Sequence, residues 1–80
     1  MIFNSIRKNG NNYSDKVAVI DRGKIFTYYM LWRDIRILGS WIDSNLEADA
    51  KIGIMLNNCY EAIVAIYAIT LTNRVCVPLD

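Results

Sequence analysis

The chain has 80 residues, nine Lys and Arg against eight Asp and Glu, a net charge of +1, and 54% hydrophobic residues. Domains usually run to ~100–150 residues, so this length suits a compact module or one part of a larger domain. The near-neutral charge excludes a strongly basic nucleic-acid binder and an acidic disordered tail. The sequence has no histidine, which excludes Ser-His-Asp catalysis, Cys-His catalysis and histidine metal sites within the chain.

The N-terminal part of the sequence predicts a short helix and then a β-hairpin. Apolar residues within residues 2–8 are spaced to suit a short helix with one buried stripe. Residues 17–20 and residues 25–28 are rich in β-branched and aromatic side chains, which favour strands. Between them, residues 21–24 carry Gly23 at their tip and predict a three- or four-residue connection. The pair should therefore be antiparallel.

A long amphipathic helix is predicted next. Apolar residues recur at steps of three and four, as on one stripe of a helix of about four to five turns. This stripe contains Leu31, Ile35, Leu38, Ile42 and Leu46. Thr27 is a suitable N-cap, and Gly39, a poor helix former, favours close contact with a second helix. Charged residues fall off the stripe, on faces expected to reach water: Arg33, Asp34, Arg36 and Asp43.

The rest of the sequence predicts a βαβ unit. Residues 51–56 are nearly all apolar and predict a buried strand, and residues 75–79 predict another. The helix between them, over residues 59–72, is apolar on almost every side, so it should be buried on most sides. The two strands should be parallel neighbours joined by a right-handed crossover.

Polar residues at both ends of this second helix predict its caps. Asn58 followed by Glu61 resembles a capping box, with Asn in place of Ser or Thr. Asn73 tolerates the left-handed conformation that ends many helices. The helix should therefore be capped from within its own sequence at each end.

The expected helices are too few for the expected parallel sheet. Parallel sheets are normally covered by helices on both faces, and one buried helix with one amphipathic helix cannot cover both. The sequence also reaches Asp80 directly after an apolar strand. We therefore interpret the chain as the N-terminal part of a larger α/β protein.

The sequence predicts no catalytic, cofactor-binding or metal-binding residue. The strand-to-helix turn at residues 57–59 has no glycine, so it matches neither a dinucleotide-binding loop nor a P-loop. Two pairs of carboxylates lie in polar segments, where solvated surface is the expected role. These are Glu47 with Asp49, and Asp34 with Asp43. Cys59 lies at a helix N-terminus, where the pKa of a thiol can fall, but without an evident cationic partner we interpret it as a small hydrophobic residue.

Neither a nucleic acid nor a membrane is expected as a partner. The small basic pairs are balanced by acidic residues, unlike a nucleic-acid surface. These pairs are Arg22 with Lys24, and Arg33 with Arg36, near Tyr28 and Tyr29. The longest apolar stretch, residues 62–71, is shorter than the ~20 residues of a transmembrane helix. Cys59 and Cys76 form no CxxC motif and no secretory signal is evident, so we expect free thiols and a cytoplasmic location.

Four strings occur in a fixed order: DKVAVID at residues 15–21, FTYYML at residues 26–31, IGIMLNNCYE at residues 52–61, and VPLD at residues 77–80. Their order and spacing resemble the N-terminus of acyl-adenylate-forming enzymes. This family, also called AMP-binding or adenylation domains, includes acyl-CoA synthetases, luciferases and the adenylation domains of nonribosomal peptide synthetases. Departures from its pattern are Ser14 and Asn57 where Pro is usual, Met30 where Glu is usual, and residues 71–73 where Lys-Ala-Gly is usual.

The resemblance implies a parent enzyme that activates a carboxylic acid with Mg-ATP, forming an acyl- or aminoacyl-adenylate and pyrophosphate. The acyl group then passes to a thiol of CoA or of a carrier protein. The family's phosphate loop, nucleotide contacts and catalytic lysine lie downstream of the matching segment, so none can be assigned to a residue here. Residues 1–80 are thus expected to be an N-terminal fragment of an AMP-binding domain, inactive and unable to bind ATP or Mg alone.

The expected partners are the rest of the adenylation domain and, for the parent, a small carboxylic or amino acid with CoA or a carrier protein. A second interpretation is a non-catalytic structural or interaction module derived from the same family. The departures from the family's strings favour it. A different nucleotide-binding α/β protein is a third interpretation, but it predicts a Gly-rich turn after a strand, which this sequence lacks.

Overall fold

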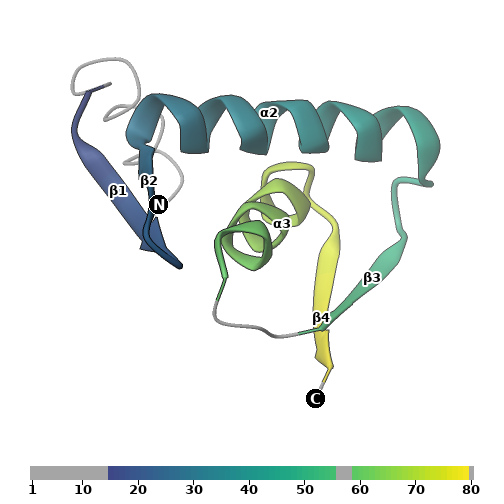
Figure 1. Cartoon of the computed structure of the whole chain (residues 1–80). Helices are drawn as coiled ribbons and strands as arrows, with labels where there is room; N and C mark the ends of the chain where they lie inside the picture. Colours follow the sequence, from purple (N-terminus) through teal and green to yellow (C-terminus); the bar gives the residue numbers. More distant parts are fainter. Residues whose placement is uncertain (1–14, 56–58, 80) are drawn as a thin grey trace.

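The computed structural model describes residues 15–55 and 59–79, and the helix predicted within residues 2–8 lies outside this part. The described elements are β1 (Val17–Asp21), β2 (Lys24–Thr27), α2 (Tyr28–Asn45), β3 (Lys51–Met55), α3 (Tyr60–Leu71) and β4 (Val75–Leu79). β1 and β2 form an antiparallel hairpin, while β3 and β4 form a separate parallel pair (Figure 1). The predicted α/β fold, with a hairpin, a long helix and one parallel βαβ unit, is confirmed.

The hairpin turns more tightly than the sequence predicted. Asp21 pairs directly with Lys24, so only Arg22 and Gly23 connect the strands. Both connecting residues have positive φ, 52° and 80°, as a type I′ turn requires. The predicted three- or four-residue loop is wrong because this turn matches the right-handed twist of the strands, and Asp21 and Lys24 then join the ladder.

The long helix α2 begins and packs as its sequence predicted. Thr27 is its N-cap, and its hydroxyl Oγ1 accepts a hydrogen bond from the backbone N–H of Met30 at 3.2 Å. Three residues of the predicted stripe are buried and the remaining two are partly buried. The buried residues are Leu31, Ile35 and Ile42. Gly39 is buried too, beside α3.

The second helix, α3, lies at the centre of the fold and contacts α2, β1, β3 and β4. Figure 1 shows it beneath α2, with the hairpin to its left and the parallel strands to its right. Its side chains meet those of α2 in the main core, which contains Leu31, Ile35, Ile42, Tyr60, Val64, Ala68 and Ile69. Only Glu61 and Thr70 of α3 are exposed, so the prediction of a helix buried on most sides is confirmed.

The sequence predicted the C-terminal cap of α3 correctly but not its N-terminal cap. Its N-cap is Cys59, which makes no side-chain cap hydrogen bond, so the predicted capping box of Asn58 and Glu61 is wrong. Asn58 itself lies outside the described residues. At the other end the expected role of Asn73 is confirmed, because its φ is +60°. Its N–H donates to Thr70 O at 3.0 Å and that of Arg74 donates to Ile69 O at 3.2 Å, which is a Schellman motif.

The parallel sheet is covered on one face only. Ile52, Ile54 and Cys76 pack against the core under α3. The other face exposes Lys51, Gly53, Met55, Val75, Val77 and Leu79. Within Lys51–Met55, the described part of the strand predicted at residues 51–56, burial on both faces is therefore wrong, since of the described helices α3 packs on one face of the sheet and α2 packs on α3. Within the described residues, neither helix is long and apolar enough to cross a bilayer.

Candidate functional site

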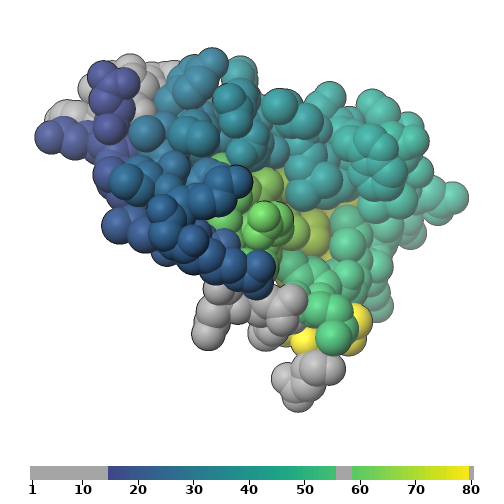
Figure 2. Space-filling view, in the orientation of Figure 1, coloured from purple at the N-terminus to yellow at the C-terminus, as the bar shows by residue number. Residues whose placement is uncertain are grey.

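One recess of the described surface involves parts of the hairpin, α2 and α3. It consists of two adjoining hollows of about 500 and 370 Å³ that share Asp34 and Leu38. We call it the α2 groove and define it by Lys24, Phe26, Asp34, Ile37, Leu38, Trp41, Tyr60, Glu61 and Val64. In Figure 2, α3, in green, forms the bottom of a recess between the hairpin and α2.

Tyr60 fixes three elements of the groove in place. It is the first residue of α3, and its ring stacks on that of Phe26 with centroids 3.6 Å apart and planes 7° apart. Its backbone N–H donates to Asp21 Oδ2 at 3.1 Å, and its hydroxyl donates to Asp34 Oδ2 at 2.6 Å. A carboxylate from the hairpin thus takes the place of a local cap and supplies the negative charge that helix N-termini favour.

Asp34 lies at the junction of the two hollows. Its Oδ1 accepts a hydrogen bond from Arg33 Nε at 3.1 Å, and its side chain is 28% exposed. Asp34 reaches water as predicted, but only in part, because the helix also turns its carboxylate toward Tyr60. Burial raises the pKa of the Tyr60 phenol, and the hydrogen bond to Asp34 and its negative charge raise that pKa further. Tyr60 therefore remains a hydrogen-bond donor at any physiological pH.

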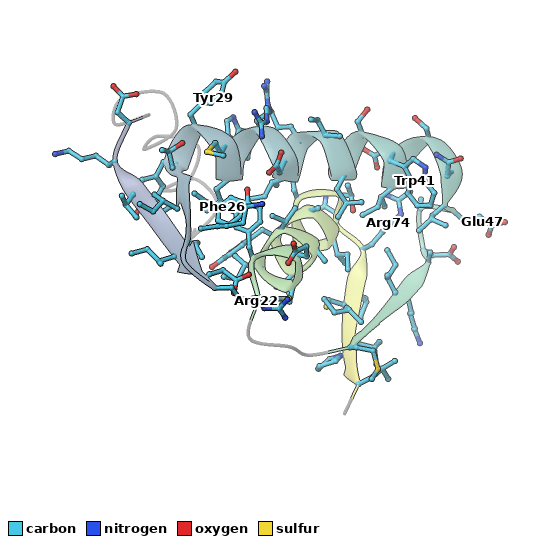
Figure 3. The ribbon with its side chains drawn as sticks, viewed as in Figure 1. Arg22, Phe26, Tyr29, Trp41, Glu47 and Arg74 are labelled. Carbon is cyan, nitrogen blue, oxygen red and sulfur yellow. The ribbon has the colours of Figure 1, made fainter. Side chains whose placement is uncertain are left out.

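A second polar cluster, around Arg74, holds the C-terminal end of α2. The Arg74 side chain is 5% exposed and its Nη1 lies 2.6 Å from Asp43 Oδ1. It also donates to Glu47 O at 2.8 Å and Leu46 O at 2.7 Å. Figure 3 shows Arg74 beneath this end of the helix, near Glu47. The sequence analysis did not identify Arg74. The feature that could have indicated it is a lone cation placed between the end of a helix and the start of an apolar strand.

The predicted carboxylate pairs are not assembled into an acid–base site in the described structure. Asp34 and Asp43 bind different partners, Tyr60 and Arg74. Glu47 contributes its backbone carbonyl to Arg74, and Asp49 is exposed in the connection before β3. Among the described residues, no three His, Cys, Asp or Glu side chains are grouped to hold a metal ion.

The other residues considered in the sequence, namely the two cysteines and the basic pairs, form no shared cluster in the described structure. Cys59 and Cys76 are free thiols of intermediate burial. Arg22 extends into solvent from the hairpin tip, whereas Arg33 and Arg36 lie 5.9 Å from the rings of Tyr29 and Trp32. Of the turn predicted at residues 57–59, only Cys59 is within the described structure. The groove itself combines apolar side chains with the carboxylates of Asp34 and Glu61 and the ammonium of Lys24.

Comparison with known proteins gives the family. The sequence model for the family described as AMP-binding enzyme matches residues 6–80. The chain therefore belongs to the AMP-binding enzyme family, as its four ordered strings indicated. A search of curated proteins gave no match to the chain.

Proposed function

We propose that this chain is the N-terminal segment of an ATP-dependent ligase that activates a carboxylic or amino acid as its adenylate. The acyl group then passes to the thiol of CoA or of a carrier protein. The observation that carries the proposal is the family match over residues 6–80. ATP and Mg belong to the complete enzyme, whose nucleotide site lies in the sequence that follows this segment.

Within that enzyme, the eighty residues act as scaffold. The exposed face of the β3–β4 sheet supports this role, because it presents Met55, Val75, Val77 and Leu79 to solvent. Parallel sheets in α/β proteins are covered on both faces, and among the described helices α3 packs on one face of this sheet and α2 packs on α3. The rest of the adenylation domain is the partner that covers the other.

ATP–pyrophosphate exchange tests the proposal. The native gene product is captured with antibodies raised against the folded 80-residue chain, its intact mass is measured, and exchange is assayed with panels of carboxylic and amino acids. We expect a native product much larger than 9.2 kDa that catalyses exchange with at least one acid. The 80-residue chain alone should show no exchange above the blank. Exchange by the 80-residue chain alone would overturn the scaffold role.

A non-catalytic module derived from the family is the second candidate function. It is favoured by departures from the family's strings, notably Met30 in the first turn of α2 where the family has Glu. The structure of the described residues also closes a shared core between α2 and α3. A native product of 9.2 kDa without exchange activity would select this candidate over the ligase segment.

A further inference from the structure

The β1–β2 hairpin packs on the helices with one face and exposes the other. None of its residues is buried, and its outer face carries Val17, Ile20 and Ile25, which are 50%, 68% and 58% exposed. Figure 1 shows the hairpin at one end of α2 and the β3–β4 pair at the other. A two-stranded hairpin is marginally stable in water by itself. This one therefore depends on the contacts that hold it against the helices.

The specific contacts of the hairpin gather on one residue, Tyr60. The ring of Phe26 stacks on the Tyr60 ring with centroids 3.6 Å apart, and Asp21 Oδ2 accepts a hydrogen bond from the Tyr60 N–H at 3.1 Å. Asp21 belongs to β1 and Phe26 to β2, so both strands contribute. The Tyr60 hydroxyl donates to Asp34 Oδ2 of α2 at 2.6 Å. A single residue thus ties the hairpin to both helices.

The first turn of α3 depends on the hairpin in return. Its N-cap, Cys59, makes no side-chain cap hydrogen bond. The bond from Ile63 N–H to Cys59 O is long, at 3.4 Å. Among the described residues, Asp21 is the side chain that bonds an N–H of this turn, and a carboxylate there satisfies a free donor and complements the helix dipole. Without Asp21 the turn keeps only a weak bond of its own.

A hinge separates the hairpin from the main core. β2 ends at Thr27 and α2 begins at Tyr28, so a single peptide joins them. The buried residues of the core all belong to α2 and α3. At its other end α2 is held by Arg74, whose side chain is 5% exposed. The helices therefore keep their buried contacts with each other when the hairpin moves.

We propose that the hairpin is a latch on the first turn of α3: the two open and close together, by rotation about Thr27, while the α2–α3 core stays closed. In the closed form Asp21 holds the Tyr60 N–H and Phe26 covers the Tyr60 ring. In the open form both contacts are lost, and the hairpin ladder and the first turn of α3 fray as one unit. α3 follows the carboxyl end of β3, the edge where open α/β sheets place their ligands. The latch therefore controls the shape of that edge.

This latch goes beyond the proposed ligase and does not depend on it. The latch is measured by hydrogen exchange of backbone amides in the 80-residue chain, whereas the ligase is measured by ATP–pyrophosphate exchange of the native gene product. Failure of either proposal therefore leaves the other intact.

Native-state hydrogen exchange of the 80-residue chain in low urea, followed residue by residue by NMR, tests the latch. The amides of Tyr60 and Ile63 and the ladder amides of β1 and β2 should share one opening free energy. That free energy should be lower than the one for the amides in the middle of α2, around Ile35. A hairpin that opens only together with the core would overturn the proposal. So would different opening free energies for the hairpin and for Tyr60.

Three variants separate a latch from a simple helix cap. Asp21→Ala should speed exchange at Tyr60 and in the hairpin ladder by the same factor, about fivefold, and leave exchange around Ile35 unchanged. Asp21→Asn keeps an acceptor oxygen and should restore most of the protection at both places. Asp49→Ala removes an exposed carboxylate before β3 and is the control, which should change neither. Faster exchange at Tyr60 alone would overturn the proposal, since Asp21 would then act as a cap without holding the hairpin.

Discussion

Replacing Arg74 with Ala should be the most destabilising single change in the described polar network. The variant loses an ion pair with Asp43 at 2.6 Å and leaves the carbonyls of Leu46 and Glu47 without the donors that lie 2.7 and 2.8 Å away. A hydrogen bond from a charged group contributes about 1.5–3 kcal/mol, and such bonds to one side chain are not additive. Because Asp43 is 63% exposed and can recover water, we expect a total cost of about 3 kcal/mol.

Urea unfolding followed by circular dichroism measures this cost. For a chain of this size, 3 kcal/mol corresponds to a fall of more than about 10 °C in the thermal midpoint. Arg74→Lys keeps the charge but not the fork of donors, so it should recover about half of the loss. Arg36→Ala, which removes an exposed arginine of α2 outside this network, is the control. It should change the free energy of unfolding by less than about 0.5 kcal/mol. A loss below about 1 kcal/mol for Arg74→Ala, or full recovery by lysine, would refute this reasoning.

Tyr60→Phe should cost about 1–2 kcal/mol at neutral pH, because Asp34 Oδ2 loses the hydroxyl that donates to it. The pKa of Tyr60 is raised above its ordinary value of 10.0, so its contribution to stability is complete below pH 10 and is lost as the pH rises through the higher folded value. The free energy of unfolding in urea should therefore fall less steeply between pH 9 and pH 12 for the Phe variant. An equal fall for both proteins would contradict the assignment. Gly39→Ala should stabilise by up to about 1 kcal/mol in thermal melts, since the added Cβ would lie 3.6 Å from its nearest neighbour, Thr72 Cγ2; destabilisation would show that the two helices need a closer approach. Asn73→Gly should be neutral or stabilising and Asn73→Ala should cost about 1 kcal/mol, as compared by urea unfolding; equal stability of the two variants would exclude a conformational role for the +60° φ.

Local patterns in the sequence were sufficient for most of the fold. The apolar stripe around Ile35 and the cap at Thr27 predicted α2, because both depend on residues within a few positions of one another. Asn73 predicted the end of α3 for the same reason. The parallel pairing of β3 with β4 followed from the order strand, helix, strand. Each of these predictions uses a spacing that the local backbone geometry fixes.

What the sequence could not predict depends on residues far apart in the chain. The N-terminus of α3 is held by Asp21, 39 positions before Tyr60, so a local capping box was the wrong prediction. Asp34 was assigned to water because its partner, Tyr60, is 26 positions away. Arg74 was overlooked because its role depends on Asp43, 31 positions before it. Such contacts exist only after the helices have packed, and a periodicity along the chain does not encode them.

The site was less predictable than the fold. The α2 groove takes its walls from three elements, and no short motif joins Phe26, Asp34 and Glu61 in the sequence. Sequence reasoning treated Arg22 and Lys24 as a basic pair. The turn geometry separates their roles, because Arg22 occupies the left-handed position at the tip and Lys24 belongs to the strand. The ordered strings predicted the family, whose match over residues 6–80 confirms it.

The two kinds of strand pairing should also set the order in which the chain folds. The hairpin closes across Arg22 and Gly23 alone, so it can form within microseconds of synthesis or refolding. The pairing of Lys51 with Val75 has to wait until the whole of α3 has formed and docked, since a crossover must bring its ends together before any ladder bond is gained. The backbone amides of β3 and β4 should therefore be the last to become protected from solvent exchange, and the first to lose that protection when the helices loosen.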